Sequence, residues 1–169
     1  MAIYQYHKQH PHLSKRFAGA MARFSQGTGQ SLEYLVAGYD WASVKNGSGS
    51  IVDVGGGNGL AAFAITSAVP GLRCTVQDLP PNVETFKDSV PEPLKGRVEF
   101  AAHDFFNTQP VQADAYLFRQ IFHNNNDAHC IKILQATIPA LRPGVKLIAN
   151  DRVVPPPGTM GLVEEREIR

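Results

Sequence analysis

A glycine-rich turn directly after a short apolar run is the feature that most constrains this chain. Residues 50–60 read SIVDVGGGNGL, in which Gly55, Gly56 and Gly57 are consecutive and Gly59 follows one residue later. Glycine lets the backbone turn tightly and lets a ligand lie close to the main chain. A plain turn between a strand and a helix needs only one glycine. The motif therefore predicts a buried strand, a ligand-binding turn, and a helix whose free N–H groups point at the same place.

The rest of the chain alternates short apolar runs with amphipathic segments. This alternation predicts an α/β fold with a doubly wound parallel sheet. The expected strands are residues 51–54, 72–79, 97–106, 113–122 and 145–154, and the expected helices between them are 60–69, 81–90 and 126–141. Two more helices are expected at 12–24 and 31–41, so we divide the chain into a helical segment, 1–49, and a ligand-binding domain, 50–169.

Composition excludes several classes of partner. The 169 residues carry a net charge of +1 with neutral histidines, which gives no electrostatic basis for binding nucleic acid or an anionic membrane. No apolar run is long enough to cross a bilayer. The two cysteines, Cys74 and Cys130, fit neither a zinc pattern nor a disulfide framework. We expect a cytoplasmic protein with reduced thiols and no metal, which acts on a small molecule.

The glycine spacing argues against a dinucleotide without excluding one. The motif reads G-x-G-x-G, with Leu60 where the dinucleotide fingerprint has its third glycine, and no Gly-Lys-Ser/Thr of a P-loop follows. Asp78 ends the second expected strand, 23 residues after Gly55. An acid at this position can accept hydrogen bonds from ribose hydroxyls, as it also does for NAD. These residues alone leave the nucleotide cofactor open.

Four segments in order resemble the motifs of S-adenosylmethionine-dependent O-methyltransferases, of the plant caffeic-acid type and its fungal relatives in secondary metabolism. They are VDVGGGNG, QDLPPNV, HDFF and the stretch 118–158, within a similarity that runs from about residue 5 to the end. The resemblance implies a Rossmann-like methyltransferase sheet, S-adenosylmethionine as cofactor and S-adenosylhomocysteine as product. His103 departs from the family, which has glycine there. The cofactor-binding residues that it implies are Gly55, Gly57, Asp78, Leu79, Asp104, Phe105 and Arg119.

His123, in FHNNND after the fourth expected strand, is the catalytic candidate. An imidazole that titrates near neutrality can remove the proton of a hydroxyl. The resemblance implies this general-base role, with Asp151 as the carboxylate that orients the ring. Asn124 and Asn125 replace the aspartate and tryptophan of the family's HDW. For the substrate, a small aromatic or polyketide-type metabolite, we expect contacts with Met21, Phe122 and Asn124, although Met21 and Phe122 fit ordinary core packing equally well.

Family members are much longer. They begin with a helical dimerisation domain and end with further helix and two antiparallel strands, so the resemblance implies a catalytic portion truncated at both ends. We expect residues 1–49 to be the remnant of the linker from the dimerisation domain, and the sheet to lack its C-terminal strands. Two other functions stay open: a cofactor-binding protein that catalyses a pericyclic or dehydration step, and a non-catalytic partner of a longer homologue. We expect a homodimer or a complex with such a homologue.

Overall fold

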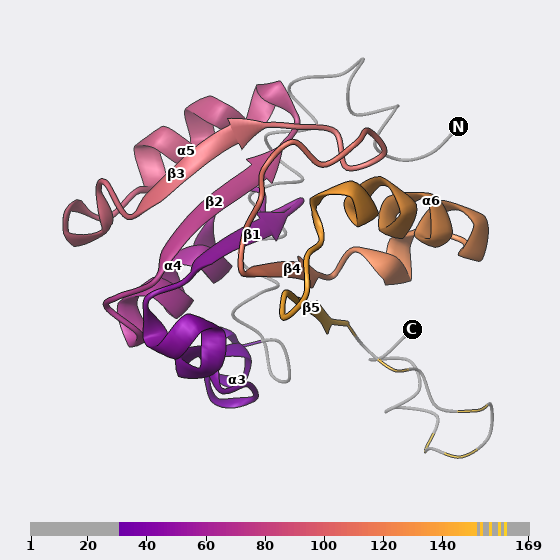
Figure 1. The fold of residues 1–169 in the computed structure, drawn as a ribbon, viewed down its shortest axis with the longest axis horizontal. Helices are drawn as coiled ribbons and strands as arrows, with labels where there is room; N and C mark the ends of the chain where they lie inside the picture. The colour runs from indigo at the N-terminus through magenta and orange to yellow at the C-terminus, as the bar shows by residue number, and fades with distance from the viewer. Residues whose placement is uncertain (1–30, 152, 154–155, 157–158, 160, 162–169) are drawn as a thin grey trace.

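A computed structural model describes residues 31–151, 153, 156, 159 and 161 (Figure 1). The expected helix at 12–24 and the candidate Met21 lie outside these residues. In chain order the main elements are α3 (Leu32–Ala37), β1 (Ser50–Val54), α4 (Leu60–Ala68), β2 (Arg73–Asp78), α5 (Val83–Ser89), β3 (Val98–Ala102), β4 (Ala115–Arg119), α6 (Asp127–Thr137) and β5 (Lys146–Asn150).

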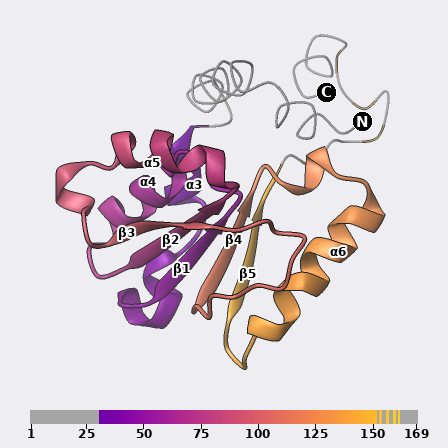
Figure 2. The same cartoon turned by 90° about the horizontal axis from the view of Figure 1, so that it is seen from above.

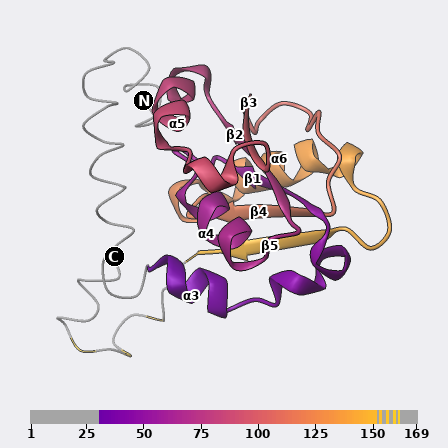
Figure 3. The same cartoon turned by 90° about the vertical axis from the view of Figure 1, so that its left-hand side faces the viewer.

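The five strands form one parallel sheet in the order β3-β2-β1-β4-β5, with β3 and β5 at its edges (Figure 3). Ile51 in β1 lies opposite Cys74 in β2 and Ala115 in β4. After β3 the chain returns across the sheet to β4, so the order reverses between β1 and β4. Ligands of open α/β sheets bind at the carboxyl ends of the strands beside such a switch point.

Both faces of the sheet are covered, which confirms the doubly wound prediction. Successive residues of a strand point to opposite faces. Ile51 therefore packs in one buried cluster with residues of α3, α4 and α5, whereas Val52 packs in a second cluster with Ile133 of α6. Figure 2 shows α6 by itself on one side of the sheet. The central strands β1 and β4 are buried between these layers, whereas β5 at the edge is largely exposed.

The segment before β1 packs into the same core. Leu35, Trp41 and Val44 are almost fully buried in the cluster that contains Ile51, and the indole Nε1 of Trp41 donates a hydrogen bond to the Leu35 carbonyl at 3.0 Å. Residues 32–47 thus cover one face of the sheet. The predicted boundary at residue 50 coincides with the start of β1, and the two-part division of the chain stays a prediction.

Several elements are shorter than the sequence pattern predicts. The helix expected at 31–41 ends at Ala37, where Gly38 follows. The strand expected at 113–122 ends at Arg119, because Gln120 has a φ of +56°, which no extended strand accommodates. The long helix expected at 126–141 ends at Thr137 and continues only as a 3-10 turn that contains Pro139, a residue without an N–H to donate.

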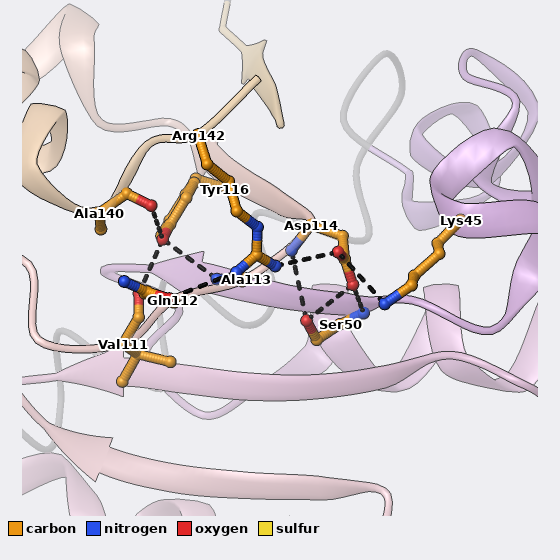
Figure 4. Close-up of polar contacts among 9 residues, drawn as sticks. All are labelled: Lys45, Ser50, Val111, Gln112, Ala113, Asp114, Tyr116, Ala140 and Arg142. Atoms are coloured by element: carbon orange, nitrogen blue, oxygen red, sulfur yellow. Dashed lines mark hydrogen bonds and ion pairs between the residues drawn. The ribbon is translucent and has the colours of Figure 1, made fainter. Parts of the chain in front are cut away.

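The amino ends of β1 and β4 are joined by a polar clamp around Asp114, directly before β4 (Figure 4). Its Oδ2 accepts hydrogen bonds from the Ser50 N–H at 2.9 Å and the Ser50 hydroxyl at 3.0 Å, and its Oδ1 lies 3.2 Å from Arg142 Nη2. Burial alone would raise the pKa of Asp114, but the bonds from Ser50 and Arg142, with Lys45 nearby, lower it below its ordinary value. The clamp fixes the rim of the sheet opposite the predicted site.

Candidate active site at the carboxyl ends of the strands

The glycine loop between β1 and α4 leaves room for a ligand. Gly55 and Gly57 have φ values of +70° and +58°, a region that glycine enters without strain. The N–H groups of Gly55 and Gly56 both donate to the Gln77 carbonyl, at 2.8 and 3.1 Å. Apart from the residues adjacent to Gly57 in the chain, no atom of the described residues lies within 4 Å of the position that a Cβ on Gly57 would take. The loop is thus held from β2, and its tip faces open space.

Asp78, at the end of β2, is bonded to this loop. Its Oδ2 accepts from the Gly57 N–H at 2.8 Å, and its Oδ1 accepts from the Leu79 N–H at 2.7 Å and from Asn82 Nδ2 at 2.8 Å. Burial raises the pKa of Asp78, and these three bonds oppose the rise. An ionised carboxylate offers about four acceptor positions, so one stays available for a hydroxyl. Sequence reasoning missed Asn82, whose only signal is its place four residues after Asp78.

The segment after β3 brings an aromatic ring to the glycine loop. The His103 N–H donates to the Asp78 carbonyl at 2.9 Å, which ties the segment to the end of β2. A ring carbon of Phe105 lies 3.5 Å from the position that a Cβ on Gly55 would take. The Asp104 carboxylate accepts from the Phe106 N–H at 3.1 Å and thereby fixes the turn. The predicted cofactor residues of three separate segments therefore meet at one place.

A buried acid lies under the loop. Asp53 of β1 is 1% exposed, and its Oδ2 has no hydrogen-bond partner among the described residues. A Cβ on Gly56 would lie only 2.5 Å from that oxygen. Burial raises the pKa of Asp53 to about 7, against the lowering effect of the Arg119 charge. Sequence reasoning assigned Asp53 no role, and the signal that it overlooked is a lone acid inside an apolar strand.

Arg119 ends β4 and lies between two acids of the site. Burial lowers the pKa of its guanidinium, and the charges of Asp53 and Asp151 oppose that shift. The next residue, Gln120, turns the chain sharply through its positive φ and begins the turn that carries His123. The end of β4 thus contributes to both the predicted cofactor pocket and the predicted catalytic pair.

His123 and Asp151 form the pair that the sequence predicts. The Nδ1 of His123 lies 2.6 Å from Oδ1 of Asp151, while Oδ2 of Asp151 accepts from the Phe122 N–H at 2.9 Å. The His123 side chain is 42% exposed, whereas that of Asp151 is 15% exposed. A neutral imidazole that donates from Nδ1 to a carboxylate has Nε2 as its acceptor. The arrangement can therefore accept a proton at an accessible ring nitrogen.

Of the residues predicted to contact the substrate, Phe122 and Asn124 lie in the described part of the chain, and both make contacts within the protein. The Phe122 ring packs 5.2 Å from the Phe118 ring, and Asn124 Nδ2 donates to the Gln120 carbonyl at 3.3 Å. Their substrate roles stay predictions. Phe122 contributes to an apolar groove of about 290 Å³ between α6 and the β4–β5 edge, lined by Phe118, Phe122, Cys130, Leu134, Leu147, Ile148 and Ala149.

Two classes of feature are not found in the part of the chain that the structure describes. No group of three or more His, Cys, Asp or Glu side chains is arranged to hold a metal ion. None of the described helices has the length and apolar character needed to span a membrane.

Comparison with known proteins places this geometry in a family. Residues 1–162 match the model of the O-methyltransferase domain. The "Grayanic acid biosynthesis cluster O-methyltransferase" of Cladonia grayi is 43% identical over 170 residues, 99% of this chain and 37% of that protein. The "O-methyltransferase pyvH" of Aspergillus violaceofuscus is 42% identical over 175 residues, 99% of this chain and 41% of that protein. The chain thus spans about two fifths of the length of these relatives.

Solved structures show the same fold. The crystal structure of TnmH superposes with a TM-score of 0.85 at 26% identity, over 99% of this chain and 48% of that one. The O-methyltransferase NcsB1, in complex with S-adenosyl-L-homocysteine and 1,4-dihydroxy-2-naphthoic acid, gives a TM-score of 0.75 at 27% identity. The match covers 88% of this chain and 44% of that one. "A Pericyclic Reaction enzyme" gives a TM-score of 0.63 at 28% identity. The match covers 71% of this chain and 32% of that one.

The family-model match covers most of the chain, and the relatives align along nearly all of it. The chain belongs to the O-methyltransferase domain family.

Proposed function

We propose that the chain is the cofactor-binding part of an S-adenosylmethionine-dependent O-methyltransferase that acts on a hydroxyl of a small secondary metabolite, aromatic or polyketide-type. His123 is its general base. The observation that carries the proposal is the 2.6 Å contact between His123 and Asp151 at the same rim of the sheet as the glycine loop. The similarity to fungal biosynthetic O-methyltransferases supports the class of substrate.

The pocket fits the cofactor in three respects. The open space at Gly57 admits the amino-acid end of the ligand beside the main chain. The remaining acceptor position of Asp78 suits a ribose hydroxyl, and a second hydroxyl bond requires the Gly57 N–H to give way. Phe105, beside Gly55, offers a ring face for adenine. NcsB1, which has the same fold, was solved with S-adenosylhomocysteine bound.

The residues of this chain would remove the substrate proton and orient the reacting groups. When bound, S-adenosylmethionine supplies an electrophilic methyl group. His123 takes the hydroxyl proton of the substrate at Nε2, and the Asp151 carboxylate stabilises the imidazolium that forms. The deprotonated oxygen would then be ready to accept the methyl group that the bound cofactor would supply. His123 afterwards returns its proton to water.

The first experiment measures cofactor affinity by calorimetry. The wild-type chain should bind S-adenosylhomocysteine, and Asp78→Ala should weaken binding by about tenfold to a hundredfold, because a charged acceptor is lost. Thermal unfolding establishes that the variant is folded, since Asp78 also holds Gly57 and Asn82. Glu99→Ala, an exposed acid of β3, is the control that keeps its affinity. Tighter binding of NAD than of S-adenosylmethionine would overturn the proposal.

A second candidate function is a non-methylating step, pericyclic or dehydrating, in which the bound sulfonium acts by its charge. The similarity to "A Pericyclic Reaction enzyme" and the asparagines that follow His123 favour it. Mass analysis of products formed with methyl-labelled cofactor separates the two. A product that carries the label supports methylation, whereas an isomerised or dehydrated product without label supports the second candidate.

A further inference from the structure

Two buried glutamines face each other next to the predicted cofactor pocket. Gln77, the penultimate residue of β2, is 1% exposed, and Gln109, in the crossover from β3 to β4, is 6% exposed. Each side-chain amide donates to the oxygen of the other at 2.8 Å, and the Gln109 oxygen also accepts from the Val111 N–H at 3.0 Å. The reaction described above uses neither residue.

The main chain of this pair connects the parts of the pocket. The Gln77 carbonyl accepts the N–H groups of Gly55 and Gly56, and the residue after it is Asp78. The Gln109 N–H donates to the Ala136 carbonyl of α6 at 2.9 Å. The pair therefore links the strand that holds the glycine loop to the crossover that leaves β3.

The crossover is the segment that carries Asp104 and Phe105, the residues predicted to flank adenine. The His103 N–H bond to the Asp78 carbonyl holds the start of the crossover. Beyond it, Phe105 packs against the second core cluster through apolar contacts, which are non-directional and tolerate sliding. A buried amide pair is directional, because leaving either amide without a partner costs free energy. A shift of the crossover relative to β2 would separate the Gln77 and Gln109 amides and leave both buried groups without each other.

We propose that the Gln77–Gln109 pair is a positioning device for the cofactor pocket. It fixes the crossover, and with it Asp104 and Phe105, relative to the glycine loop and Asp78, so that the adenine and ribose contacts are preorganised before the ligand arrives. The inference rests on the proposed function for the identity of the ligand. Preorganisation raises affinity because less ordering has to occur on binding.

The test compares three variants of the whole chain: Gln77→Met, Gln109→Met and the double variant. Methionine has nearly the shape of glutamine without its polar groups. Each single variant leaves one amide buried without its partner and should lower the unfolding midpoint. The double variant removes both amides and leaves only the Val111 N–H without its acceptor, so it should recover part of the loss. The affinity of the double variant for S-adenosylhomocysteine should nevertheless stay about tenfold below wild type.

Two further measurements separate positioning from general stability. Amide hydrogen exchange of the ligand-free double variant should be faster in residues 103–112 than in wild type, with α4 unchanged. Where turnover is measured, KM for S-adenosylmethionine should rise with little change in kcat. The matched control is Thr66→Val, which removes another buried hydrogen bond, to the Ala62 carbonyl, and should lower stability without altering affinity or exchange in the crossover.

Wild-type affinity in the double variant, or unchanged exchange in residues 103–112, would overturn the inference. Failure of the wild-type chain to bind S-adenosylhomocysteine would instead overturn the proposed function. In that case the exchange measurement, made without ligand, still decides whether Gln77 and Gln109 fix the crossover.

Discussion

At the scale of single residues, His123 is the side chain on which the proposed chemistry depends. Removing the imidazole in His123→Ala should lower turnover by about 10²–10⁴ and leave the affinity for S-adenosylhomocysteine unchanged, because in the proposed mechanism the ring acts on the substrate proton and not on the cofactor. Asp151→Asn should act in the same direction, since an amide no longer stabilises the imidazolium. Steady-state kinetics with methyl-labelled cofactor, together with calorimetry, measure both effects.

A His123→Ala enzyme with wild-type turnover would assign proton removal to another group. Loss of cofactor affinity in the same variant would indicate that His123 and Asp151 hold the loop after β4 rather than act on substrate. Asp151→Asn keeps an oxygen that can accept from the Phe122 N–H, so it separates the loop contact from the carboxylate charge.

The buried Asp53 makes the stability of the chain depend on pH. Its pKa is about 7 in the folded state and 3.8 in the reference state. Between pH 3.8 and about 7, Asp53 is therefore protonated in the folded chain and ionised in the unfolded chain. Stability should therefore fall as the pH rises from about 4 to 7, by on the order of 3 kcal/mol in total. Asp53→Asn should flatten this part of the profile, measured as unfolding midpoint against pH. A profile equally steep in the variant would trace the effect to another group.

Residues of the candidate site can be predicted from the sequence when they belong to a local motif. They cannot when their hydrogen-bond partners lie far away along the chain. Asp78 ends β2 and His123 follows β4, both at motif positions, so the resemblance indicates both. Gln77 and Gln109 are 32 residues apart, and nothing local to either predicts that they pair inside the molecule. Asn82 escaped notice for a related reason, because its role depends on the direction in which the helix after Asp78 begins.

At the scale of elements, the clamp around Asp114 joins β1 to β4. Asp114→Ala should lower the free energy of unfolding by about 1–2 kcal/mol at pH 7, because the Ser50 and Arg142 donors lose a charged acceptor. The folded pKa of Asp114 lies below its ordinary value. The contribution of ionised Asp114 to the free energy of unfolding is therefore fully present when the pH is above the ordinary pKa of aspartate, and it is lost as the pH falls through the pKa of Asp114 in the folded chain.

Urea unfolding at pH 7 and at pH 3 measures this difference. The exposed Asp88 in α5 provides the control, since Asp88→Ala should leave stability nearly unchanged at both pH values. An equal effect of Asp114→Ala at both pH values would show that packing rather than charge holds the two strands together.

The order and type of the elements follow from the sequence, but their ends do not. Apolar alternation predicts all five strands of the sheet, because strands of a parallel sheet carry the apolar residues that the helical layers cover. The ends depend on single backbone conformations. Nothing in the composition of 113–122 indicates that Gln120 takes a positive φ, which the turn toward His123 imposes on it.

At the scale of the whole molecule, β5 leaves an edge of the sheet uncovered in the part of the chain described. All the described residues of β5 are at least partly exposed, and Leu147 is 46% exposed. Ile131, Leu134 and Ile138 form an exposed apolar stripe along α6 and the turn after it. Unpaired edge strands and apolar patches promote association. The purified chain should therefore self-associate at micromolar concentration, as measured by light scattering.

Leu147→Lys should reduce this association, because a charge on an edge strand opposes pairing with another chain. Tyr34→Lys, a change at an exposed aromatic residue of α3, is the matched control. A monodisperse monomer of the wild-type chain with a cooperative thermal transition would contradict the prediction. Co-purification with a longer homologue would favour the expected complex over a homodimer.

The pairing of β1 with β4 also affects the order in which parts of the chain fold during synthesis. Ser50 and Asp114 touch, yet they are 64 residues apart in the chain. During synthesis β1 leaves the ribosome long before its second neighbour exists, and closing so long a loop costs entropy before any contact offsets it. The glycine loop and His123 come together only when β4 docks beside β1. We therefore expect the edge of the sheet that carries the glycine loop and His123 to be among the last parts of the nascent chain to form. A ligand that contacts both the glycine loop and the residues after β4 should bind only chains in which β4 has paired with β1.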